Sequence, residues 1–224
     1  MKTFKLHLIR HGMTAGNLQG LYIGSGTDIP LCDEGRAQLN ELKERFEYPQ
    51  VDTVFSSPLL RAVETANILF PDAKHTFTVH DLREAGFGKF ENKPVKELVH
   101  DEDFKKWITP GSGYVPEGAE PTDQFHARCA ESLMKLFEYM IRMDVTEAAC
   151  VTHGGVIMSM LSSARCPPAP GAVDGRPRLR LHRADRCAAV DAGPSGGSHR
   201  RSCPLAIADT LRGQAETEEN EAFE

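Results

Sequence analysis

Short segments with the pattern of strands alternate with helical segments along the first 163 residues, and few folds accommodate this order. Apolar and polar residues alternate over residues 4–9, which predicts a strand that leads into Arg10. Apolar runs at 51–55 and 148–151 predict two further strands.

A helical pattern follows each of these predicted strands. Asp33 is expected to cap the first helix and Ser57 the second, with Pro58 in its first turn. Apolar residues recur at helical spacing over 125–140, which predicts a long amphipathic helix, and another helix is expected at 156–161. Strands and helices in this order indicate an α/β fold with a mainly parallel central sheet.

Charged and imidazole side chains stand where the predicted strands end. Arg10 and His11 follow the first strand, Arg61 lies shortly after the second, and His153 follows the third. The carboxyl ends of parallel strands are where α/β sheets place ligands. Arg61 falls in the first turn of its helix, where a cation opposes the helix dipole unless an anion lies nearby.

Two further segments add to this set. Gly154 and Gly155 begin a predicted helix, so their N–H groups form a natural anion site and allow close approach of a ligand. Glu84, just before Gly86 and Gly88, is a candidate proton donor. Each segment alone is better explained as a surface residue or a turn, but together they suit phosphoryl transfer.

Phosphoryl transfer requires groups of these kinds. A neutral imidazole is a nucleophile, arginines bind phosphate oxygens through paired hydrogen bonds, and a carboxylic acid protonates the departing oxygen. The sequence therefore predicts His11 as the nucleophile, Arg10 and Arg61 as phosphate ligands, and Glu84 as the acid.

With these motifs in order, the chain resembles the histidine phosphatase superfamily, also called the phosphoglycerate mutase-like family. The resemblance extends to about Ser163 and rests on four separate motifs. They are Leu8-Ile9-Arg10-His11-Gly12-Met13-Thr14 with Asn17, Ser57-Pro58-Leu59 with Arg61 and Thr65, Leu82-Arg83-Glu84 with Phe87-Gly88, and Thr152-His153-Gly154-Gly155.

The resemblance implies a three-layer α/β/α sandwich and a phosphohistidine intermediate on His11. It also implies that Glu84 acts as acid and then as base, and that a small phosphorylated metabolite is hydrolysed without a metal or other cofactor. It assigns Arg10, Arg61 and His153 to the phosphate oxygens, and Asn17, Thr14 and Gly154 to the rim of the substrate site.

The segment from Glu84 to Gly88 resembles the phosphatase branch of the family, which includes enzymes that act on α-ribazole phosphate. A phosphoglycerate mutase-type phosphotransferase is the alternative. Asn92 is expected to accept a positive φ where the family commonly has glycine. Residues 92–121, with Trp107, are predicted to form the lid that selects the substrate.

Composition narrows the class of partner. A net charge of -6 and a pI near 5.9 argue against a dedicated nucleic-acid binder. The six cysteines show no metal-like spacing, which indicates incidental thiols in a reducing compartment. No apolar run resembles a secretory signal or a membrane span, so a cytoplasmic protein is expected.

The composition changes near Ala164. From there to Cys203 the chain is rich in Arg, Ala, Pro and Gly and has no aromatic residue. We interpret 1–163 as the catalytic domain and 164–224 as an aberrant tail. The tail is either disordered or translated out of frame, which the other two reading frames of the coding DNA would test. A product that is non-functional, or that binds anions through its basic tail, is the remaining alternative.

Overall fold

The computed structural model describes residues 2–165, so the predicted tail lies outside the described residues apart from the end of the last helix. The strands are β1 (Lys5–Arg10), β2 (Leu21–Tyr22), β3 (Thr53–Ser56), β4 (His75–Thr78), β5 (Lys93–Pro94) and β6 (Glu147–Thr152). The helices are α1 (Ala15–Leu18), α2 (Asp33–Arg45), α3 (Leu60–Leu69), α4 (Val95–Leu98), α5 (Glu102–Ile108), α6 (Thr122–Arg142) and α7 (Gly154–Arg165), with short 3-10 turns at His80–Leu82 and Gly88–Phe90.

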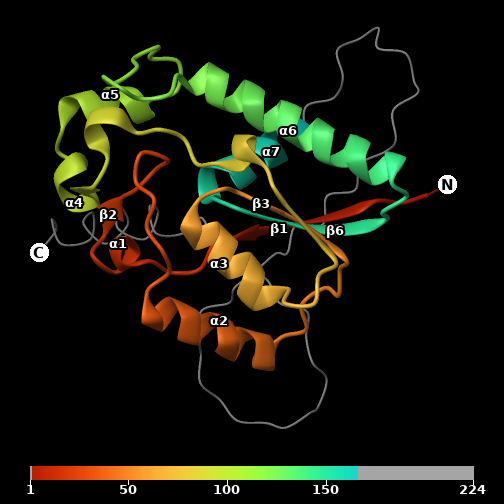
Figure 1. The fold of residues 1–224 in the computed structure, drawn as a ribbon. Helices are drawn as coiled ribbons and strands as arrows, with labels where there is room; N and C mark the ends of the chain where they lie inside the picture. The colour runs from red at the N-terminus through yellow and green to blue at the C-terminus, as the bar shows by residue number, and fades with distance from the viewer. Residues whose placement is uncertain (1, 166–224) are drawn as a thin grey trace, which may run out of the picture.

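Four parallel strands form the central sheet in the order β1-β6-β3-β4 (Figure 1). Helices α6 and α7 cover one face of the sheet and α2 and α3 the other (Figure 1). The predicted three-layer α/β/α sandwich with a parallel sheet is confirmed.

Neighbouring residues of each central strand enter different cores. Val54 lies in the core beneath α2 and α3, and Phe55 lies in the core beneath α6 and α7. Ala149 and Cys150 divide between the two cores in the same way. This alternation follows from the two-residue period of a strand, and it buries both faces of a parallel sheet.

The beginnings of two helices differ from the sequence prediction. The Sγ atom of Cys32, not Asp33, accepts the capping hydrogen bond of α2, from the N–H of Gly35 at 3.3 Å. Helix α3 begins at Leu60, and Ser57 lies before it in the connection from β3. The hydroxyl of Ser57 instead lies 2.7 Å from Nε2 of His153, so the predicted N-cap belongs to the site.

The turn at Gly88–Phe90 and residues 92–121 together form a small unit beside the sheet. It contains β5, which pairs with β2, and the short helices α4 and α5. Its core is the cluster Phe90, Leu98 and Phe104. Asn92 has a φ of 59°, as predicted.

No helix within residues 2–165 is long and apolar enough to cross a bilayer. Over the same residues, Cys32, Cys129 and Cys150 are free thiols. The other three cysteines lie in the part of the chain that the structure does not describe.

Candidate active site

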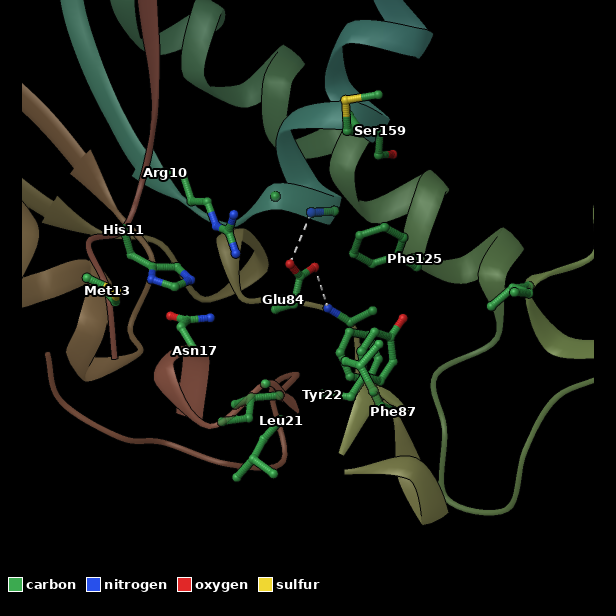
Figure 2. A pocket seen from close by; sticks show the side chains of 18 of the residues that line it. Arg10, His11, Met13, Asn17, Leu21, Tyr22, Glu84, Phe87, Phe125 and Ser159 are labelled. Carbon is green, nitrogen blue, oxygen red and sulfur yellow. Dashed lines mark hydrogen bonds between the residues drawn. The ribbon is translucent and has the colours of Figure 1, made fainter. Parts of the chain in front are cut away.

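A cleft of about 1050 Å³ opens where the central strands β1 and β6 end (Figure 2). Five of the predicted site residues line it: Arg10, His11, Asn17, Glu84 and Gly154. Because β1 and β6 are parallel and paired in register, segments far apart in the sequence end side by side. The topology thus explains why the motifs meet.

His11 has one ring nitrogen available for chemistry. Its Nδ1 lies 2.7 Å from the carbonyl oxygen of Gly12, and a carbonyl only accepts, so the proton of the neutral ring belongs on Nδ1. Burial, together with the charge of Arg10, lowers the pKa of His11 to about 3. The ring is therefore neutral near pH 7, with the lone pair on Nε2, and it lies between Arg10 and Asn17 (Figure 2).

Glu84 lies across the cleft from His11 (Figure 2) and is only 8% exposed. Its Oε1 accepts a hydrogen bond from the N–H of Ala85 and its Oε2 one from the N–H of Gly155, both at 3.0 Å. A Cβ on Gly155 would lie 2.5 Å from Oε1, so a larger residue at this position would displace the Glu84 carboxyl. Burial raises the pKa of Glu84 even though these N–H groups and the nearby arginines oppose the rise. A carboxyl with a raised pKa retains its proton at higher pH, as a general acid requires.

Arg61 and His153 lie buried beneath the cleft rather than in its lining. Arg61 is 2% exposed, which excludes a solvated arginine, and it donates hydrogen bonds to the carbonyls of Thr27 and Gly24. The ring of His153 is centred 5.2 Å from that of His11. Burial and the neighbouring charges hold the pKa of His153 well below its usual value. Nδ1 of His153 has no hydrogen-bond partner among residues 2–165.

Thr14, predicted at the rim, is 2% exposed and lies outside the cleft lining. It caps α1, and both its N–H and its hydroxyl donate to Oδ1 of Asn17. This fixes the Asn17 amide with its oxygen bound, so that the NH₂ group remains for a ligand. Thr14 therefore positions Asn17.

The sequence that forms this site matches a known protein family. The sequence model of the histidine phosphatase superfamily (branch 1) matches residues 6–172. The chain belongs to this superfamily.

Relatives within the superfamily include phosphatases, which supports the assignment of this chain as a phosphoric monoester hydrolase. Fructose-2,6-bisphosphatase TIGAR B of Danio rerio is 32% identical over 193 residues, covering 81% of this chain and 69% of that protein. Adenosylcobalamin/alpha-ribazole phosphatase of Salmonella typhimurium is 28% identical over 168 residues, covering 74% and 81%. The crystal structure of alpha-ribazole phosphatase from Shigella flexneri matches with a TM-score of 0.63 at 28% identity, covering 73% of this chain and 80% of that one.

Sequence reasoning missed the hydrogen bonds that hold His11, the predicted nucleophile. The hydroxyl of Thr65 accepts from the N–H of Gly12 at 2.9 Å and donates to the carbonyl of Arg61 at 2.6 Å. Gly12 in turn accepts the bond from His11. Helix α3 therefore helps to orient the imidazole that directly follows β1.

Arg128 of α6 was also missed, because on a helical pattern it looks like a solvated surface residue. Its guanidinium donates to the backbone carbonyls of Asp81, Arg83 and Glu84, at 2.8, 2.9 and 3.1 Å. Nε and NH2 also bind the carboxylate of Glu120 in a paired contact, at 2.6 and 2.8 Å. The side chains of Arg128 and Glu120 are 11% and 15% exposed. Arg128 thus holds the segment that carries Glu84.

Replacing Arg128 by alanine is expected to lower kcat about 10- to 100-fold, because a displacement near 1 Å of a catalytic group can cost about a hundredfold. The free energy of unfolding should fall by about 3 kcal/mol, since Glu120 loses its paired contact in a poorly exposed place and keeps only Arg83, at 3.9 Å. Glu84 should become better solvated, and its pKa should fall toward its ordinary value.

Steady-state pH profiles and thermal melts test this role. In Arg128→Ala the loss of kcat on the alkaline side should begin at lower pH, which a purely structural role would not produce. Arg142→Ala, an exposed change on the same helix, should match the unmodified protein. An unchanged profile in Arg128→Ala would show that Arg128 does not position Glu84.

Proposed function

We propose that this chain is a phosphomonoesterase that hydrolyses a small phosphorylated metabolite through a phosphohistidine at His11. The observation that carries the proposal is the bond from Nδ1 of His11 to Gly12, which leaves the lone pair on Nε2 in the cleft. The raised pKa of Glu84 across the same cleft supports a general acid opposite this nucleophile.

In the first step, Nε2 of His11 forms a bond to phosphorus as the bond from phosphorus to the ester oxygen breaks. The departing oxygen takes the proton of Glu84 and leaves as an alcohol. In the second step the Glu84 carboxylate takes a proton from water, whose oxygen attacks phosphorus. The bond from phosphorus to nitrogen then breaks, which releases phosphate and restores His11.

Negative charge spreads over the phosphoryl oxygens during the transfer, and the two arginines and several hydrogen-bond donors stabilise it. Arg10 lines the cleft, and Arg61 uses two of its N–H groups on backbone carbonyls, which leaves others for an oxygen. Asn17 and the N–H of Gly154 supply further donors at the rim. His153 packs beside His11 beneath the cleft. The two arginines supply the positive charge that the proposed cycle needs, so the cycle is written without a metal or cofactor.

A phosphoenzyme trapping experiment tests the proposed function. Full-length protein is mixed with 4-nitrophenyl phosphate in excess chelator, and samples are quenched in alkali and in acid. We expect turnover in chelator and a phosphoryl adduct on the His11 peptide that survives alkali and disappears in acid. An adduct elsewhere, or phosphate release without one, would contradict the proposal. Transfer between the positions of phosphoglycerate without phosphate release would instead indicate a mutase.

A further inference from the structure

We propose that the cleft selects phosphomonoesters whose leaving group carries an aromatic ring and no second anionic group. The ring packs against an aromatic wall formed by Tyr22, Phe87 and Trp107. This inference rests on the proposed function, because it names the class of leaving group that the same site accepts.

The aromatic wall stands on the side of the cleft where the leaving group must lie. Glu84 donates to the departing oxygen, so the rest of the leaving group extends from Glu84. Figure 2 shows Phe125, Tyr22 and Phe87 beside the Glu84 carboxyl, on the side that faces away from His11. Burial, with the charges of Glu84 and Glu91, raises the pKa of Tyr22 to about 12, so its phenol keeps its proton near pH 7.

Contacts among the rings fix the wall before a ligand binds. Tyr22 stacks on Phe87 at 4.1 Å between ring centroids, and Trp107 meets both rings edge-on, at 6.1 and 5.6 Å. The buried rings of Phe104 and Phe90 support Tyr22 and Trp107 from behind, at 5.4 and 5.5 Å. A wall already ordered by packing loses little conformational freedom on binding, so stacking with a ligand ring adds to affinity.

Glu91 connects this wall to the phosphate side of the site. Its carboxylate accepts hydrogen bonds from the N–H groups of Phe87, Gly24 and Gly26. Gly24 in turn accepts a hydrogen bond from Arg61. The wall and the phosphate ligand Arg61 are therefore held at a fixed separation, which sets the distance between the phosphoryl group and the ring.

The charges of the cleft disfavour a second phosphate. Beyond Arg10, Lys96 is the only lysine or arginine among the lining residues of the described chain. Glu120 also lines the cleft, and its paired contact with Arg128 already occupies that guanidinium. A second dianionic group would lose its hydration and find only the Lys96 ammonium group in a cleft that Glu120 also lines, which does not compensate for the loss.

Fluorescence offers a direct test, because Trp107 is the only tryptophan of the chain. Full-length protein is titrated with three phosphonates, which lack the ester bond that the enzyme would cleave. They are 2-phenylethylphosphonate, propylphosphonate and propane-1,3-bisphosphonate. We expect the phenyl compound to change the emission of Trp107 saturably and to bind at least about 10-fold more tightly than propylphosphonate. The bisphosphonate should bind no more tightly than propylphosphonate.

Two variants test whether the aromatic wall causes the preference for the phenyl compound. Competition against hydrolysis of 4-nitrophenyl phosphate gives a second measure of affinity. Trp107→Leu should reduce the ratio of the two affinities to about one third or less of its original value. Phe46→Leu, a matched change after α2 and outside the cleft lining, should keep the ratio. Thermal melts show whether each variant is folded.

Equal affinities of the phenyl and propyl compounds for the unmodified protein would overturn the inference, as would tightest binding of the bisphosphonate. Either result would leave the proposed phosphatase chemistry intact, because binding is measured without turnover. Conversely, the expected preference in a protein that forms no phosphohistidine would refute the chemistry and keep the aromatic site.

Discussion

Asparagine in place of His11 is expected to lower phosphate release by roughly a thousandfold or more, because removing a catalytic nucleophile typically costs at least that much. The amide NH₂ can retain the hydrogen bond to the Gly12 carbonyl, but no atom is left that can attack phosphorus. The alkali-stable adduct should disappear together with turnover. Binding of phosphonates should persist, because Arg10 and Arg61 are unchanged.

The matched control for this variant is His7→Asn on the same strand. His7 pairs with Glu147 at 2.8 Å and lies outside the cleft lining, so turnover should remain within a few-fold of the unmodified protein. Initial rates of phosphate release and mass spectrometry of quenched samples make the comparison. Near-normal turnover in His11→Asn would show that His11 is not the nucleophile.

Glutamine in place of Glu84 should have an effect that depends on the leaving group. An alkyl phosphate needs a proton on its departing oxygen, so kcat should fall roughly 10²- to 10⁴-fold. 4-Nitrophenolate is a good leaving group without protonation, so the first step should survive, whereas water is no longer activated in the second. Rapid mixing should therefore show a burst of one nitrophenol per protein followed by slow turnover. Equal losses for both substrates and no burst would exclude Glu84 as acid and base.

The pH dependence of kcat follows from the same two groups. His11 must be unprotonated, and its pKa is lowered to about 3, so activity should fall only as the pH drops through that value. Glu84 must be protonated in the first step, and its pKa is raised above 4.5, so activity with alkyl phosphates should fall as the pH rises through the raised value. The alkaline fall should be much weaker with 4-nitrophenyl phosphate.

Much of the fold could be predicted because its signals are local. The two-residue period of β1 and the helical period of α6 are visible in the sequence, and the parallel topology then brings the strand ends together. Strand β4 was missed because His75–Thr78 is short and mostly exposed, and it pairs with β3 on one side only within the described residues. Nothing in its own residues distinguishes it from a loop.

The hydrogen bonds of the site could not be predicted in the same way, because they join distant segments. Ser57 was expected to cap a helix, but His153, far along the chain, is its partner. Arg128 lies at a polar position of an amphipathic helix, and its carbonyl partners come from the loop before Glu84. Local spacing contains no information about either pairing, so only the folded chain reveals them.

The division between the sheet and the small cluster of Phe90, Leu98 and Phe104 has a consequence for how such a protein diversifies. The groups proposed to act on phosphorus gather where the central strands end, whereas the three rings of the aromatic wall pack against this small cluster. Mutations in the small cluster and its wall leave the two main cores untouched, so new substrate preferences can arise with little loss of chemical competence. Directed evolution aimed at residues 87–108 would accordingly find altered specificity more often than inactive protein.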